Sequence, residues 1–100
     1  MAQANFIPIV NHVWGSALSI AVNLHLLTSM PDMPGGLFPS KPMLEFDTTS
    51  KNIFITDLAE EKFTILDQIK NNNGYVKSTE TIGIGINPNK DFIKKYQFNE

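Results

Sequence analysis

The chain of 100 residues is long enough for one small domain or for part of a larger one. Its composition, 42% hydrophobic and 18% charged residues, is ordinary for a globular chain and argues against intrinsic disorder. The net charge is −2 and the basic residues are eight scattered lysines, so we do not expect nucleic-acid binding.

The first three predicted elements are a strand, a helix and a second strand. Residues 6–10 form an apolar run typical of a short buried strand, although Pro8 is awkward in a central ladder position. Ser16 is a candidate N-cap for a helix over residues 17–29. The apolar residues of this helix occupy nearly its whole circumference, which predicts burial on most sides. Residues 43–46 form the second strand.

The segments on either side of residue 50 are less regular. Residues 30–42 contain four prolines and two glycines, so they form a long loop, and connections of this length often lie at a functional site. We expect a third strand over residues 52–56. Residues 60–69 have a mixed apolar pattern that fits either a helix or an irregular segment.

The last part of the chain alternates turns with regular structure. Residues 71–74 (NNNG) form a turn. The strict alternation of isoleucine and glycine over residues 82–86 predicts a strand with one face left bare for close backbone approach. A short helix over residues 90–96 ends the chain, with Phe92, Ile93 and Tyr96 directed inward.

This order of elements predicts an incomplete structure. Strand, helix and strand make a βαβ unit of the kind that builds parallel sheets. One such unit cannot cover its own sheet edges or a helix that is apolar all round. We therefore expect the chain to be part of a larger body, and to be poorly folded or to aggregate in isolation.

Four motifs, in order, resemble members of the enolase superfamily of the mandelate racemase and muconate lactonizing enzyme kind. They are residues 10–21 (VNHVWGSALSIA), 42–49 (PMLEFDTT), 73–76 (NGYV) and 83–86 (GIGI). The first two resemble the ends of the seventh and eighth barrel strands. The chain departs from the family at Asn11, where proline is usual, and before Gly83, where Pro-Gly punctuation is usual.

The resemblance implies an α/β fold, the C-terminal piece of a (β/α)8 barrel followed by an irregular β-rich tail. Residues 1–50 would end the barrel domain, and residues 51–100 would return to the capping domain. The rest of the barrel and the capping domain would then be partners of this chain, and the intact enzyme would be a homo-oligomer. The alternative is an independent small α+β protein that serves binding or assembly.

His12 is the first candidate catalytic residue. It follows a predicted strand end, which in a (β/α)8 barrel is the catalytic face. By resemblance it is a general acid or base at a substrate carbon, paired with an aspartate that this chain does not contain in recognisable form. Imidazole suits this task because it titrates near neutral pH. The alternative is a surface or capping histidine. His25, within the predicted helix, is expected to be a core histidine with one hydrogen bond.

Glu45 is the second candidate catalytic residue. By resemblance it keeps its proton through a raised pKa and donates a hydrogen bond to the oxyanion that develops on the substrate carboxylate. The alternative is a carboxylate satisfied by backbone amides. Asp47 lies on the same strand face as Glu45 or caps the following turn. Trp14 lines the substrate pocket or packs under the helix.

The resemblance also implies Mg²⁺ in the intact enzyme, with ligands that are absent from this chain. Magnesium needs several oxygen ligands in near-octahedral geometry. The family supplies them, and a lysine base, from earlier strands. Six of the carboxylates in the second half of this chain show no ligand spacing: Asp57, Glu60, Glu61, Asp67, Glu80 and Asp91. The isolated chain should therefore be inactive.

The implied substrate is a small carboxylate, from which the enzyme removes the proton next to the carboxyl group. We expect a dehydratase of sugar acids or hydroxy acids, with a racemase, an epimerase or a cycloisomerase as alternatives. The absence of cysteine excludes disulfides and thiolate zinc sites. Residues 1–5 lack a secretory signal, and residues 17–27 are too short and polar to span a bilayer, so we expect a cytoplasmic protein without membrane contact.

Overall fold

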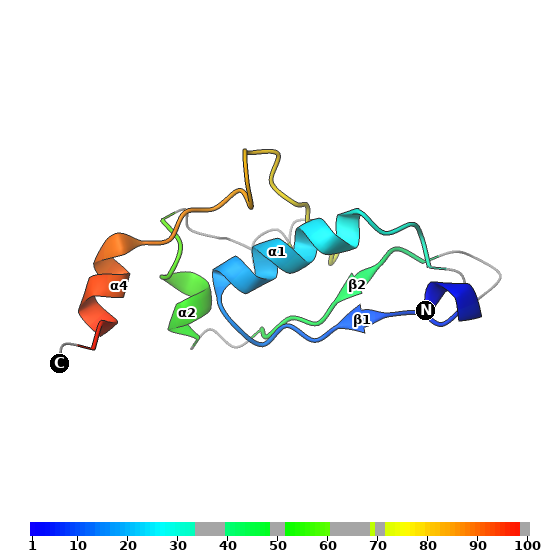
Figure 1. The fold of residues 1–100 in the computed structure, drawn as a ribbon, viewed down its shortest axis with the longest axis horizontal. Helices are drawn as coiled ribbons and strands as arrows, with labels where there is room; N and C mark the ends of the chain where they lie inside the picture. The colour runs from blue at the N-terminus through cyan, green and yellow to red at the C-terminus, as the bar shows by residue number, and fades with distance from the viewer. Residues whose placement is uncertain (34–39, 49–51, 61–68, 70–71, 99–100) are drawn as a thin grey trace.

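The computed structural model describes residues 1–33, 40–48, 52–60, 69 and 72–98. The elements in chain order are η1 (Gln3–Asn5), β1 (Val10–Asn11), α1 (Ala17–Thr28), β2 (Met43–Leu44), α2 (Ile53–Thr56) and α4 (Lys90–Tyr96). In Figure 1, α1 lies along the two strands, and α2 and α4 lie toward the C-terminal end. None of the helices in this part of the chain combines the length and apolarity needed to cross a bilayer.

The two strands are parallel neighbours, with Val10 opposite Met43 and Asn11 opposite Leu44. Because α1 lies between them in the sequence, they form the predicted strand–helix–strand order with the predicted parallel pairing. A parallel pair requires such a crossover, since a tight turn can join only antiparallel strands. That this unit belongs to a (β/α)8 barrel remains a prediction.

The first strand begins later than the sequence predicts and is not buried. Phe6 has a left-handed backbone with φ of 55°, and the amide of Ile7 donates to the carbonyl of Ala2 at 3.1 Å. The chain therefore turns back where the strand was expected. Pro8 has no amide to donate to a ladder, so pairing starts only after it. Phe6 and Ile7 are exposed, and the prediction of a buried strand over residues 6–10 was wrong.

The predicted helix start is confirmed. The Ser16 hydroxyl accepts from the amide of Ser19 at 3.3 Å, and the Ser19 hydroxyl accepts from the amide of Ser16 at 3.4 Å. This reciprocal capping box satisfies two amides that the first turn leaves without helical partners. It begins α1 directly after residues 12–15, which places the helix start close to the end of β1.

Helix α1 is buried on one face, so the predicted burial on most sides was wrong. Its buried residues are Ala17, Ile20, Ala21, Leu24 and Leu27. Ile20 packs with Val13 and Ile55, against which Leu44 and Phe46 also lie. Val22 and Leu26, on the other side of the helix, are about half exposed, whereas β2 and α2 contact the helix within the described part of the chain.

Two further predicted strands are absent from the described residues. Residues 53–56 form the helical turn α2, because the Asn52 side chain accepts from the amide of Phe54 at 3.1 Å and acts as an N-cap. Residues 82–86 form turns in which Gly83 and Gly85 have positive φ. The predicted close approach does occur, since a Cβ on Gly85 would lie 1.5 Å from the Thr79 hydroxyl oxygen. The alternation therefore marks a glycine-dependent turn.

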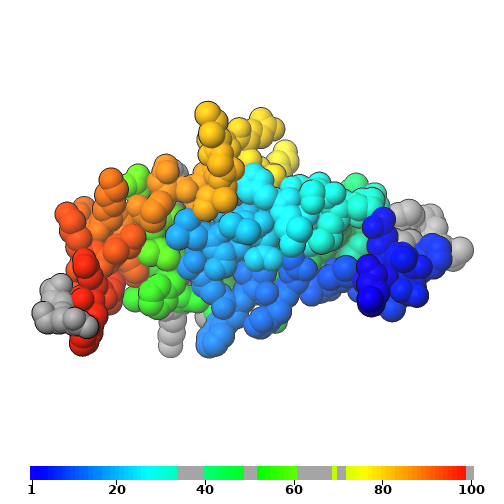
Figure 2. Space-filling view, viewed as in Figure 1, coloured from blue at the N-terminus to red at the C-terminus, as the bar shows by residue number. Residues whose placement is uncertain are grey.

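The C-terminal segment is less β-rich than predicted. Its described residues hold α2, α4 and an isolated bridge between Ala59 and Pro88. The terminal helix was predicted correctly, but only Phe92 is buried, and Ile93 and Tyr96 are about half exposed. Figure 2 shows the segment after Val76, drawn in yellow, standing out from the body above α1.

Several sequence predictions concern residues outside the described ones. These include most of the segment 60–69, Asn71 in the predicted turn and the middle of the long loop. The ends of that loop are described: Met33 and Ser40 form an antiparallel bridge, with amide-to-carbonyl distances of 2.7 and 3.2 Å. Residues 72–74 lie in a turn, in agreement with the prediction.

The molecule exposes more surface than its mass requires. Its accessible surface is 7642 Å², whereas a compact monomer of 11.2 kDa exposes about 5,700 Å². The radius of gyration is 15.6 Å, against about 13 Å for a compact domain of this length. Exposed apolar side chains such as Val10 and Met43 contribute to this surface. That the chain is part of a larger body, and that it is poorly folded or aggregates in isolation, remain predictions.

We predict that the isolated chain self-associates through the sheet face that carries Val10 and Met43. Replacing both, Val10→Lys with Met43→Glu, should shift the chain toward monomer, because the change removes apolar surface and places opposite charges at paired positions. Size-exclusion chromatography with light scattering over a dilution series measures the shift. Val22→Lys, on the exposed side of α1, is the matched control, and an equal shift in that variant would contradict the prediction.

Candidate active site

The two predicted catalytic residues leave the sheet side by side. His12 directly follows β1 and Glu45 directly follows β2, each one residue beyond the paired positions Asn11 and Leu44. The amide of Glu45 donates to the carbonyl of Asn11 at 3.1 Å, so the pairing continues past the assigned strands. Because the strands are parallel, their carboxyl ends meet at the same edge of the sheet.

His12 and Glu45 contact each other directly. The contact joins the His12 Nδ1 atom to the Glu45 Oε2 atom, and it is a hydrogen bond that becomes an ion pair when the imidazole is protonated. Both side chains are exposed, at 76% for His12 and 55% for Glu45. A hydrogen bond between the two atoms requires one proton, which either of them can carry. The contact occupies Nδ1, and within the described residues Nε2 makes no hydrogen bond to another side chain or to the backbone.

The pair lies on the sheet face that α1 does not cover. Side chains alternate along a strand, so His12 shares a face with Val10 and Trp14, and Glu45 shares it with Met43. All five are exposed. We call these residues the open face: Val10, His12, Trp14, Met43 and Glu45. The alternate residues point the other way, toward α1, where Val13 is buried and Leu44 and Phe46 join the core.

An open face of this composition is unusual for a parallel sheet, because such sheets are normally covered on both sides. Val10 and Met43 are paired across the strands and are 53% and 48% exposed. They place an apolar surface beside the contact between His12 and Glu45, a combination of apolar and polar groups that small-molecule sites share. Trp14 is 76% exposed, so it does not pack under α1, and its predicted part in substrate binding stays a prediction.

The remaining polar residues singled out in the sequence have other surroundings. His25 is half-buried on α1, and its Nε2 atom lies 3.3 Å from the carbonyl oxygen of Ile84. It makes the single hydrogen bond expected of it, but at the rim of the core. Asp47 is half-buried and has an interaction partner, while the turn it was expected to cap lies outside the described residues.

The described residues do not fit a magnesium site. Among them, no three histidine or acidic side chains gather closely enough to hold a metal ion. His12 and Glu45 supply one nitrogen and one carboxylate, and magnesium needs more oxygen ligands in near-octahedral order. Glu61 and Asp67 lie outside the described residues. The described residues alone therefore do not complete a magnesium site.

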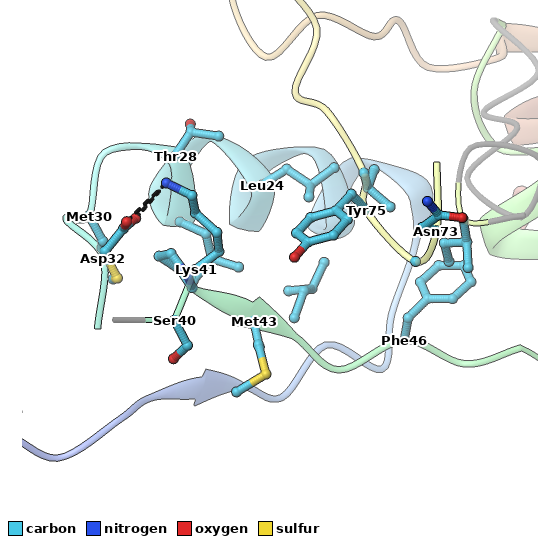
Figure 3. A pocket seen from close by; sticks show the side chains of 16 residues that line it. Leu24, Thr28, Met30, Asp32, Ser40, Lys41, Met43, Phe46, Asn73 and Tyr75 are labelled. Atoms are coloured by element: carbon cyan, nitrogen blue, oxygen red, sulfur yellow. Dashed lines mark hydrogen bonds and ion pairs between the residues drawn. The ribbon is translucent and has the colours of Figure 1, made fainter. Parts of the chain in front are cut away.

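A groove on another part of the molecule was not predicted from the sequence. Its volume is about 720 Å³, and Figure 3 shows it between α1, the segment that contains β2 and the turn that precedes Tyr75. Leu24 is among its lining residues, as is Met43, which the groove shares with the open face, and an ion pair between Lys41 and Asp32, with Nζ–Oδ1 at 2.8 Å, lies at one end. Neither His12 nor Glu45 lines it. The groove and the acid–base pair are therefore separate features.

The sequence also did not reveal a hydrogen bond beneath the pair. The Asn11 side-chain amide donates to the Asn23 side-chain oxygen at 2.9 Å and so joins β1 to α1. Asn23 in turn donates to the carbonyl of Ser19 at 2.9 Å. Two asparagines twelve residues apart carry no sequence signal for such a bond, because only the packing of helix on sheet brings them together.

Comparison with known proteins gives one informative similarity. No protein-family model matches the sequence. The chain is 30% identical over 97 residues to D-galactarolactone cycloisomerase from Agrobacterium fabrum. The aligned region is 97% of this chain and 24% of the relative, so the chain spans about a quarter of the length of the curated relative it matches. This distant similarity supports a relationship at the level of the enolase superfamily, to which that relative belongs.

Proposed function

We propose that this chain is the C-terminal part of a longer enolase-superfamily enzyme, in which His12 and Glu45 carry out proton transfer beside a substrate carboxylate. The observation that supports this most directly is the contact between the two side chains at adjacent ends of parallel strands. The apolar remainder of the open face supports it too, because that surface would form part of a pocket once further polypeptide covers it. The rest of a barrel and a capping domain would supply that cover.

His12 is the residue we assign to proton transfer with the substrate. Its Nδ1 atom is held by Glu45, so Nε2 is the ring atom left to accept or donate the reacting proton. A carboxylate in that position selects the tautomer with hydrogen on Nδ1 and supports the imidazolium form. The geometry thus gives the imidazole a defined acid–base atom without any other group from this chain.

Glu45 has two compatible tasks in this proposal. In the structure its Oε2 atom contacts the imidazole, which orients His12. Only one oxygen is needed for that contact, so the other can face a substrate carboxylate and donate a hydrogen bond when the group is protonated, the role expected from the sequence. The second task depends on a substrate bound over the open face.

Magnesium, in this proposal, is held by residues of the longer chain. Bound there, it would stabilise the negative charge that proton removal leaves on the substrate carboxylate. The described residues of this chain do not form its ligand set. The contribution of this chain is the protonation step, which depends only on the paired side chains.

Two reactions share this chemistry. Cycloisomerisation is favoured by the name of the similar protein, which acts on a sugar-acid lactone. Dehydration of a sugar acid or hydroxy acid is the reaction expected from the sequence motifs, and it uses the same abstraction of a proton beside a carboxylate. We propose cycloisomerisation first, since it alone is supported by a similar protein.

The test of the proposed function begins with the DNA upstream of the codon for Met1. We expect an in-frame extension, and the longer protein should exchange a substrate proton for deuterium and turn over acid or lactone substrates. His12→Asn should lower kcat by about 10²–10⁴-fold because proton transfer is lost. Glu45→Gln should lower kcat by about 10²–10³-fold because it removes the charged partner and the acidic donor. Steady-state kinetics measures both.

Lys94→Ala, on the exposed side of α4, is the control and should leave kcat unchanged. Normal turnover in the His12→Asn variant would contradict the catalytic assignment. A chain without an upstream extension that behaves as a sharp monomer and unfolds cooperatively would contradict the proposal as a whole. That outcome would favour the alternative of an independent small α+β protein.

The two proposed reactions differ in the mass of their products. Cycloisomerisation should give a product with the mass of its substrate, whereas dehydration removes one water molecule. Mass spectrometry of reactions with a panel of sugar acids and their lactones distinguishes the two. We expect products of unchanged mass from a lactone. Loss of water from an open-chain acid, with no reaction of lactones, would assign the dehydratase reaction instead.

A further inference from the structure

Asn11 is attached to the structure at three points. Its backbone carbonyl accepts from the amide of Glu45 at 3.1 Å, and its own position is paired with Leu44. Its side chain donates to Asn23 of α1 at 2.9 Å. Asn11 therefore connects β2, α1 and, through the peptide bond, His12.

Within the described part of the chain, the His12 side chain is bonded to Glu45 alone. The strands on which the pair depends are only two residues long. The His12 side chain is 76% exposed, so the orientation of its backbone depends on its two neighbours, Asn11 and Val13, which both face α1. Val13 is held by burial at 4% exposure. Apolar packing is not directional, whereas a hydrogen bond sets both a distance and an angle.

The partner of Asn11 is itself fixed. Asn23 lies within α1, and its side-chain amide donates to the carbonyl of Ser19, one turn earlier, at 2.9 Å. This bond orients the Asn23 oxygen toward β1. Both asparagines are half-buried, so an unpaired amide at either position would lose hydrogen bonding that water only partly replaces. The bond between them therefore favours the placement of β1 in which Asn11 lies opposite Asn23 of α1.

We propose that Asn11 is a positioning residue for His12. Its side-chain bond to Asn23 holds the end of β1 against α1, and its carbonyl bond to Glu45 aligns β2 with it, so that the imidazole and the carboxyl meet. This inference rests on the proposed function for its catalytic meaning. The alignment of positions 12 and 45 that it predicts can be measured without an activity assay.

Because the chain has no cysteine of its own, an introduced pair of cysteines reports the proximity of two chosen positions without competing thiols. The full 100-residue chain carrying His12→Cys with Glu45→Cys is equilibrated in glutathione redox buffers at high dilution. The fraction oxidised gives the effective concentration of the two thiols. Adding Asn11→Leu, which keeps the side-chain size but removes the donor, should lower that effective concentration about fivefold, the factor expected for one hydrogen bond.

Two controls decide between positioning and general stability. Asn23→Leu removes the acceptor for Asn11 and should lower the effective concentration by a similar factor, with no further loss when it is combined with Asn11→Leu. A second cysteine pair, Glu60→Cys with Asn87→Cys, reports on the bridge between Ala59 and Pro88, where the Glu60 amide lies 2.9 Å from the Asn87 carbonyl. Asn11→Leu should not change the effective concentration of the thiols in this second pair.

Three results would overturn the inference. The first is an effective concentration of the thiols at positions 12 and 45 that Asn11→Leu leaves unchanged. The second is an equal loss at both pairs, which would mean general unfolding. The third is a full additional loss when Asn11→Leu and Asn23→Leu are combined, which would mean that the two side chains do not act through the bond between them. A failure of the kinetic test of His12 would leave these thiol measurements untouched, so the two proposals fail separately.

Discussion

The backbone hydrogen bond from the Glu45 amide to the Asn11 carbonyl is the interaction on which the candidate site depends. It extends the pairing of β1 and β2 by one residue, to the point where both chains leave the sheet. Because the strands are parallel, the residues that follow each strand emerge at the same edge. His12 and Glu45 are those residues, and their contact is a direct consequence of the strand direction that α1 makes possible.

The pleat of the same two strands gives the sheet one face that is buried against α1 and one face that is exposed. Val13 faces α1 and is buried with Ile20, and Leu44 lies against the same cluster. Val10 and Met43 face away from α1 and are about half exposed. An apolar layer that meets water loses the free energy that its burial would contribute, about 25 cal/mol for each Å². In our proposal, further polypeptide covers this face.

The apolar residues of the open face affect the chemistry of the polar pair beside them. An imidazole held at Nδ1 by a carboxyl group presents one ring nitrogen for proton transfer, and a drier surrounding strengthens the electrostatic effect of that pair. In this chain alone the pair is exposed to water. The similarity to a cycloisomerase that is about four times longer agrees with a site whose walls come from more than one part of a polypeptide.

The sequence by itself determined the features that depend on neighbouring residues. Ser16 begins α1 because its hydroxyl and that of Ser19 each accept from the other residue's backbone amide, and the Asn89 side chain caps the start of α4 in a similar local way. The order of strand, helix and strand followed from apolar runs and their boundaries, and with it the positions of His12 and Glu45 near strand ends. These are local signals, so they can be read without knowledge of the fold.

Only the tertiary structure decided the features that join distant residues. The contact of His12 with Glu45 spans 33 positions and the bond from Asn11 to Asn23 spans 12. The local sequence pattern also gave a wrong prediction where two local effects compete. The alternation over residues 82–86 predicts a strand, but Gly85 adopts a positive φ and the chain turns there. Long-range contacts form only when packing brings elements together, and a single sequence carries no direct signal of which side chains will then meet.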